Sequence, residues 1–276
     1  MEVSAKNSIT RESNHAKKAH KITLGIAVTG LFSLCTQAAW ADEQGKLSLT
    51  SGFDYSSGKY GTNEKTDILT IPIIGKYETG LWTLKLTVPY VRITGTGNVL
   101  PDIGKVKNST TTRRTTESGL GDVVAGATYN LYTGSADGLV VDFTGKVKFG
   151  TADKDKGLGT GKDDYSGQFD LYKSFGNVTV LGSLGYKVYG DTDDAPLKNV
   201  GFGSVGGTYK LTADTSAGVI YDYHPKISQS GSNLSEMTAF VNHKISHDWK
   251  AQAYLVKGFA DGSPDYGVGA LVSYTF

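Results

Sequence analysis

The stretch DFTGKVKF, residues 142–149, has the pattern that predicts the fold. Every second residue is apolar or small, and the residues between them are polar or charged: Asp142, Thr144, Lys146 and Lys148. Successive side chains of a strand point to opposite faces, so this stretch predicts a strand with one apolar and one charged face. The same alternation recurs in 82–88 and 122–131. A soluble β-sandwich alternates in the same way, so strand lengths, turn lengths and aromatic positions must distinguish the two classes.

The composition narrows the class of protein. The 276 residues include 36 Gly, 16 Tyr and 10 Phe, and 28 Lys and Arg nearly balance 27 Asp and Glu. This near-neutral charge argues against a nucleic-acid-binding protein. The chain has no second long apolar run, which argues against a bundle of membrane helices. A polar chain rich in Gly, Tyr and Phe is compatible with a transmembrane β-barrel, in which only every second residue faces lipid.

Residues 1–41 are predicted to be a cleaved signal peptide. Three lysines in 17–21 precede an apolar run, 22–34, that is too short to span a bilayer, and Ala39-Trp40-Ala41 is a small-x-small cleavage site. An N-terminal membrane anchor is the alternative interpretation. We therefore expect an exported chain whose residues 42–276 form one barrel in the outer membrane. Cys35, the only cysteine, leaves with the signal, so the mature chain has no disulfide and no thiolate.

After the signal peptide, alternating segments of similar length predict twelve strands. They are expected at 46–57, 66–78, 81–94, 119–132, 138–150, 164–174, 177–189, 199–211, 215–225, 234–246, 248–258 and 265–276. Short and long connections alternate, the long ones being 58–65, 95–118, 151–163, 190–198, 226–233 and 259–264. An even strand number with this alternation predicts an antiparallel up-and-down barrel whose short turns face the periplasm.

Aromatic residues gather at both ends of the expected strands. Near the short turns these are Tyr77, Trp82, Tyr129, Tyr132, Phe175, Tyr209, Trp249 and Tyr274, and near the long loops Phe53, Tyr55, Tyr90, Phe149, Tyr165, Tyr186, Tyr221, Tyr223 and Tyr266. Two such belts are typical of the two interfaces of a membrane. The chain ends with Tyr274 and Phe276 on one strand face, which resembles the C-terminal signal that the barrel-assembly machinery reads.

Several short motifs carry a family resemblance. They are Gly119-Leu120-Gly121-Asp122, Lys148-Phe149-Gly150-Thr151, residues 157–161 (GLGTG), residues 173–176 (KSFG) and residues 184–186 (LGY). In order and spacing the chain resembles the family of small outer-membrane barrels assigned to the phenol meta-degradation pathway. The resemblance implies a barrel in the outer membrane and passage of small, including aromatic, compounds.

If the apolar residues face lipid, alternation directs a charged set toward the lumen. A Lys on the lipid face near the bilayer midplane costs roughly 2–4 kcal/mol, so these residues are expected to line a pore: Asp54, Lys76, Lys85, Asp122, Asp142, Lys146, Lys148, Asp170, Lys187, Lys210, Asp222, Glu236, Lys244 and Lys250. They could pair into a network that plugs the barrel or line a water-filled channel, and twelve strands are compatible with both.

Lysines at the pore mouth and in one loop indicate an anion preference. Lysines 76, 85, 210, 244 and 250 fall near the short turns and would form a ring there, unless they extend to the interface. The longest loop carries Lys105, Lys107, Arg113 and Arg114. Folded inward, that loop would form a basic constriction, and the alternative is a solvated loop.

Two other functions remain open, and no cofactor is expected. An outer-membrane lipase or protease would need a histidine near a nucleophile, and His224 lies beside Asp222 and a loop with Ser228. A closed barrel could instead present its loops to partners. Loop carboxylates at 153–164 and 191–194 do not have the spacing of an EF-hand, so we expect them to be solvated or to meet ions that bridge lipopolysaccharide.

Overall fold

The computed structural model describes residues 45–101, 103–105, 113–134, 138–190 and 197–276. The predicted signal peptide lies outside these residues. The strands are β1 (Lys46–Gly58), β2 (Thr66–Thr79), β3 (Trp82–Gly95), β4 (Val99–Leu100), β5 (Gly104–Lys105), β6 (Thr115–Leu120), β7 (Val123–Thr133), β8 (Leu139–Phe149), β9 (Asp164–Phe175), β10 (Val178–Val188), β11 (Val200–Lys210), β12 (Thr215–His224), β13 (Leu234–Lys244), β14 (Trp249–Gly258) and β15 (Tyr266–Thr275). In the part of the chain that the structure describes, no helix is long and apolar enough to cross a bilayer.

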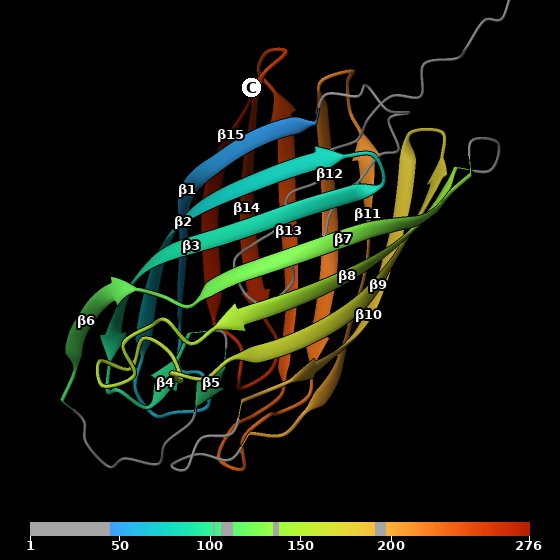
Figure 1. Cartoon of the computed structure of the whole chain (residues 1–276). Helices are drawn as coiled ribbons and strands as arrows, with labels where there is room; N and C mark the ends of the chain where they lie inside the picture. Colours follow the sequence, from blue (N-terminus) through green and yellow to red (C-terminus); the bar gives the residue numbers. More distant parts are fainter. Residues whose placement is uncertain (1–44, 102, 106–112, 135–137, 191–196) are drawn as a thin grey trace, which may run out of the picture.

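The wall strands close into an antiparallel barrel (Figure 1). Each strand from β7 to β15 pairs with its sequence neighbours, the first strand β1 pairs with the last strand β15, and β2 joins β1 to β3. Counting β6 and β7 as one interrupted strand gives a closed barrel of twelve strands. The predicted fold class and strand number are therefore confirmed.

The expected strand at 119–132 is divided into β6 and β7, a difference that has a local cause. β3 pairs with β6 through Tyr90–Gly95 and with β7 through Trp82–Thr87. Between these two stretches lies Pro89, which has no N–H for a ladder and accepts a 2.8 Å hydrogen bond from the Gly121 amide. The chain leaves the ladder at Gly121 and Asp122, which frees the Asp122 carboxylate for other contacts.

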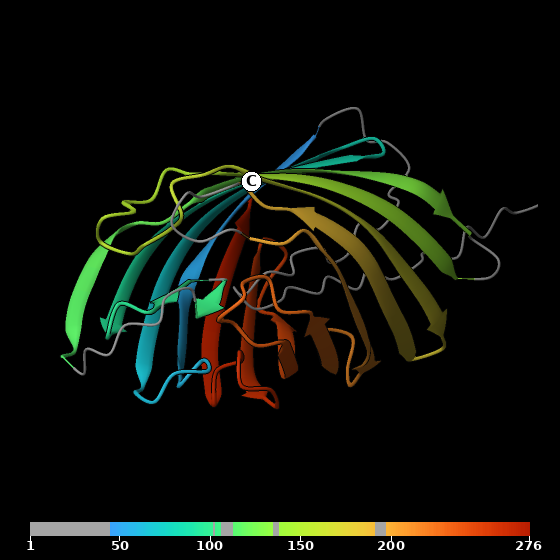
Figure 2. The same cartoon turned by 90° about the horizontal axis from the view of Figure 1, so that it is seen from below.

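The two ends of the barrel differ. One end, here called the short-turn end, carries the brief connections and the C-terminus, and the other, the loop end, carries the long connections (Figure 1). The small hairpin of β4 and β5 interrupts the longest loop and was not expected from the sequence. Seen from the loop end, this hairpin lies inside the ring of wall strands (Figure 2).

The outer face of the barrel is apolar, with aromatic residues at both ends. Leu84, Leu86 and Phe169 on successive outward positions are each about half exposed or more. At the short-turn end, Trp82 contacts Tyr129 with a ring separation of 4.8 Å, and further pairs join Trp249, Tyr274 and Phe276. At the loop end Tyr55 packs against Tyr266. This arrangement has the band and the two girdles of a membrane-spanning barrel.

Buried apolar side chains form three clusters inside the barrel. One lies on the inward faces of β9 to β15 and consists of Tyr172, Leu181, Ile220, Phe240, Tyr254, Val256 and Leu271. The other two join loop residues to the wall at the loop end: Tyr60, Ile68, Val91, Ile93, Val99, Ala152 and Leu158 in one, and Ile103, Tyr189, Leu197, Val200 and Ile227 in the other. The loops are therefore packed into the mouth of the barrel.

Candidate functional site: the barrel lumen

A cavity of about 190 Å³ occupies the lumen between the loop end and the middle of the barrel. Its wall includes inward residues of β1 to β3 and β7 to β13, and its cover includes residues of three loops. Among its lining residues are seven of the charged residues that alternation directs inward, and also Asp164, which was not predicted to line a pore; the seven are Asp54, Lys85, Asp122, Lys146, Lys148, Lys187 and Glu236. The cavity therefore has charged residues of both signs in its wall and apolar loop residues in its cover.

Four of these charges form a connected ion-pair network on β8 to β10. The Lys148 Nζ lies 2.6 Å from an Asp122 Oδ2 and 3.3 Å from an Asp164 Oδ2. Lys187 lies 3.3 Å from the same Asp164 oxygen and stands over the Tyr189 ring at 4.4 Å from its centroid. Because Asp164 is fully buried, its charge requires these two partners.

The same network fixes the loop of residues 150–163. Asp122 accepts a 2.9 Å hydrogen bond from the Ala152 amide, and Asp163 accepts one of 2.8 Å from the Gly150 amide. Lys148 also donates to the Lys162 carbonyl at 3.2 Å. Leu158, which is 2% exposed, anchors the tip of the loop among apolar side chains of the wall. The loop is thus held by charge at its base and by apolar contact at its tip.

The first long loop directs an aromatic ring into the cavity. The Thr62 amide donates to the Lys59 carbonyl at 2.8 Å, and both central residues, Tyr60 and Gly61, have positive φ. This is the type I′ geometry, which is unusual for a tyrosine and costs on the order of 1 kcal/mol. The buried Tyr60 hydroxyl donates to the Ser56 Oγ at 2.8 Å, and burial raises the pKa of this phenol.

The longest loop enters the mouth with its apolar residues. Leu100, Pro101 and Ile103 line the cavity, whereas Lys105, Arg113 and Arg114 are not among its lining residues. Lys107 lies outside the described residues. Arg114 is exposed and pairs at 2.7 Å with Asp67, whose strand position has the outward parity of its neighbours Leu69 and Ile71. The inward-folded part of this loop is therefore apolar, and the described basic residues expected at a constriction, Lys105, Arg113 and Arg114, do not line the cavity.

The remaining predicted pore residues lie at inward strand positions outside the cavity. Asp142 accepts a 2.7 Å hydrogen bond from Asn130, and Asp170 accepts one of 2.6 Å from Ser183; both carboxylates are buried. Toward the short-turn end lies Lys76, which pairs with Glu78 at 3.0 Å. The same end carries Lys210 and Lys244, the last residues of β11 and β13, and Lys250, the second residue of β14. The last two lie directly opposite each other.

Several buried polar atoms on β12 to β14 lack a hydrogen-bond partner among the described residues. They include the Asp222 Oδ1, the Asn242 Nδ2 and both side-chain polar atoms of Gln252. Buried polar groups are ordinarily satisfied by protein or by ordered water. These side chains point into the lumen, so this wall is suited to contact with water or with a polar solute.

The sequence analysis missed the apolar part of the lumen. Ile220 and Phe240 have the inward parity, are at most 3% exposed and contact each other within the cluster on β9 to β15. The sequence did carry a sign of this apolar surface: residues 219–221 are all apolar, so both the inward and the outward positions are apolar there. A strand with one polar face does not require this. The lumen is therefore apolar where this cluster lies, although polar side chains such as Asp222 and Gln252 share the wall of β12 to β14 with it.

The residues considered for catalysis do not form a triad. The His224 ring stacks on Phe202 with ring centroids 4.8 Å apart, and its Nε2 has no hydrogen-bond partner among the described residues. Ser228 donates to the Lys105 carbonyl. No group of three His, Cys, Asp or Glu in the described ranges is arranged to hold a metal ion; Asp191, Asp193 and Asp194 lie outside those ranges.

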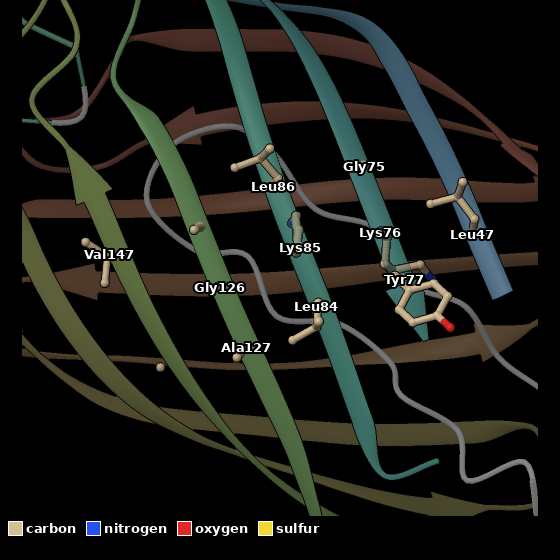
Figure 3. A pocket seen from close by; sticks show the side chains of 12 residues that line it. Leu47, Gly75, Lys76, Tyr77, Leu84, Lys85, Leu86, Gly126, Ala127 and Val147 are labelled. Atoms are coloured by element: carbon tan, nitrogen blue, oxygen red, sulfur yellow. The ribbon is translucent and has the colours of Figure 1, made fainter. Parts of the chain in front are cut away.

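A second hollow, of about 510 Å³, lies on the outer wall across β1, β2, β3, β7 and β8 (Figure 3). Leu84, Leu86 and Val147 border it, and small residues such as Gly75 and Gly145 leave it open. Lys85 lies between the two leucines on β3 (Figure 3). Because this surface is the apolar face, the hollow is a place for acyl chains rather than part of the lumen.

Comparison with known proteins agrees with this geometry. A family model described as "Putative MetA-pathway of phenol degradation" matches residues 56–276. No curated protein sequence matches the chain.

Solved structures of similar fold are outer-membrane proteins. The COG4313 outer membrane channel from Pseudomonas putida F1 superposes with a TM-score of 0.61 at 14% identity, over 87% of this chain and 100% of that chain. The KdgM porin gives a TM-score of 0.49 at 11% identity, over 83% and 99% of the two chains. The Pseudomonas putida toluene transporter TodX gives 0.40 at 14% identity, over 84% and 88%. The first of these likenesses shows a shared fold.

Proposed function

We propose that this chain, which belongs to the family described as "Putative MetA-pathway of phenol degradation", is an outer-membrane channel for the passive passage of small solutes. The observation that carries the proposal is the closed barrel with an apolar outer face and a charged cavity inside it. A fully plugged barrel would satisfy its interior polar groups internally. The unpartnered atoms of Asp222, Asn242 and Gln252 support a lumen that water enters instead.

In this proposal the short-turn end faces the periplasm and the loop end faces outward, after export directed by residues 1–41. Solutes enter past Leu100, Pro101, Ile103 and Leu158, which narrow the mouth. They then meet the charged wall of β8 to β10. This order favours small compounds with an apolar part and a polar or anionic part, which includes aromatic acids.

The packed loops favour one other candidate, a closed barrel that presents its loops to partners. Leu158, Val99 and Ile227 are all at most 3% exposed, so the mouth is well packed in this conformation. Conductance distinguishes the two candidates, because a barrel that stays closed carries no current.

The test is a planar bilayer recording of the purified protein. We expect discrete steps of small conductance with potassium chloride on both sides. The matched variant is Leu158→Ser, which removes the apolar anchor of one loop and should raise the conductance or the frequency of opening. If bilayers carry no current with either protein, although both proteins are correctly folded, the channel is rejected and the closed barrel is favoured.

A further inference from the structure

Four inward lysines lie on one line across the barrel wall. In the strand registers, Lys76 on β2 is opposite Lys85 on β3, Lys85 is opposite Gly126 on β7, and Gly126 is opposite Lys146 on β8. Lys146 and Lys187 are both opposite the same serine of β9. We call Lys76, Lys85, Lys146 and Lys187 the lysine row. Lys76 and Lys85 are on neighbouring strands, and from Lys85 onward a small residue, a glycine or a serine, lies between successive members.

The lysine row runs obliquely from one end of the barrel toward the other. Lys76 lies three residues before the end of β2 at the short-turn end, and Lys187 lies one residue before the end of β10 at the loop end. Strands are about 4.8 Å apart, so five strand steps cover roughly 24 Å along the wall. With a strand tilt of about 40° the row rises by about 15 Å, or half the hydrocarbon thickness.

A second row runs parallel to the first and carries the opposite charge. It is four residues away along each strand, as Asp142 is from Lys146 on β8, which corresponds to about 13 Å. Successive opposite residues in this acidic row are Asp142, Asp170, Ser183, Ser204, Asp222 and Glu236. Part of the inward charge is therefore arranged in two oblique rows, one basic and one mainly acidic, which neither the sequence nor the strand count predicted.

The two rows differ in their access to the cavity. Lys85, Lys146 and Lys187 line it, whereas Glu236 is the one member of the acidic row that does, and Asp142 and Asp170 are at most 1% exposed. Lys146 donates to the neutral Gln168 Oε1 at 3.4 Å and pairs with no carboxylate among the described residues. Lys187 shares its acid with Lys148. A solute in the cavity thus meets three lysines of the row on this wall, of which Lys187 already has an acidic partner in Asp164.

Beyond Lys187, at the loop end of the lysine row, the wall is aromatic. Phe202 and His224 stack face to face and both line the cavity, as does Tyr189 beside Lys187. A flat ring can pack against such a surface while its anionic group contacts a lysine. Charge and apolar surface are therefore placed side by side along the same path.

We propose that the lysine row is a track that binds small organic anions, carboxylates in particular, and passes them from the loop end to the short-turn end. This inference rests on the proposed function, because a track requires an open channel. Lys76 and Lys85 are one strand spacing apart, and from Lys85 onward successive lysines are two spacings, about 10 Å, apart, so a carboxylate leaving one ammonium comes within reach of the next. Counter-cations are repelled along the same path.

The test is the reversal potential across a gradient of potassium benzoate, and separately of potassium chloride, at about 0.1 M. We expect the wild-type channel to pass both anions better than potassium. Lys85→Gln combined with Lys146→Gln should lower the anion-to-potassium permeability ratio about fourfold. This value is for the loss of two unit charges, each about 8 Å from the permeating ion in water and screened over about one Debye length. Lys85→Arg combined with Lys146→Arg should retain the wild-type ratio.

The control is Lys257→Gln, an equal change of charge at an exposed, outward position of β14. Its ratio should equal that of the wild type. If the wild type conducts but the double glutamine variant has the same anion-to-potassium permeability ratio, the track is overturned and the channel stands. The same conclusion follows if chloride passes and benzoate does not. A wild type that carries no current overturns the proposed channel, and the track with it.

Discussion

Lys148 is expected to hold the loop of residues 150–163 in the mouth of the barrel. Its ammonium group lies 2.6 Å from Asp122 and donates to the Lys162 carbonyl at 3.2 Å. Lys148→Met keeps the apolar stem but removes both contacts as well as the 3.3 Å ion pair with Asp164, and it leaves Asp122 without its counter-ion. A charge-assisted hydrogen bond contributes about 1.5–3 kcal/mol, so at the low end the two together contribute about 3 kcal/mol. That corresponds to roughly a 10²-fold larger population of the undocked loop.

Hydrogen exchange followed by mass spectrometry on peptides that cover this loop measures that population. The Gly150 and Ala152 amides donate to Asp163 and Asp122, so docking protects them from exchange. In Lys148→Met we expect their protection to fall by roughly 10²-fold, with little change in the strands.

The matched control is Lys156→Met in the same loop. Its ion pair with Asp153, at 4.0 Å, joins two side chains that are about half exposed, and such pairs contribute about 0–1 kcal/mol. Protection should therefore stay within a few fold of the wild type. Equal exchange in Lys148→Met and Lys156→Met would refute the assignment of Lys148 as the residue that docks the loop.

Three further predictions concern the wall. Leu86→Arg, on the outward face of β3, should destabilise the barrel in lipid by about 2–4 kcal/mol, whereas Thr87→Arg, which faces the cavity, should destabilise it much less. Urea unfolding in liposomes measures both changes in stability, and equal losses would contradict the assigned faces. Tyr254→Phe removes a 2.7 Å hydrogen bond to a buried carboxylate of β1 and should cost about 1–3 kcal/mol, while the lipid-facing control Tyr209→Phe should leave the unfolding midpoint unchanged. Deletion of Phe276, whose ring packs on Tyr274, should lower the fraction of folded barrel in cells but leave refolding in detergent intact. Heat-modifiable migration on gels measures the folded fraction, and normal assembly in cells would exclude an assembly signal at this position.

The division of β6 from β7 illustrates what alternation leaves undetermined. The sequence predicts one continuous strand over 119–132, and only the pairing with β3 brings Pro89 beside Gly121. The resulting break exposes Asp122 to Lys148, a contact between residues 26 apart in the chain. No local pattern predicts it, because the partner is selected by the register.

The sequence by itself determined the face on which each strand residue lies and how many strands close the wall. It did so because the side-chain period of a strand is two and because lipid excludes charge from one face. Only the tertiary structure decided which charges become neighbours. The order of strands around the barrel and their stagger align Lys85 with Lys146, and pack Leu158 into the mouth, across distances that periodicity does not encode.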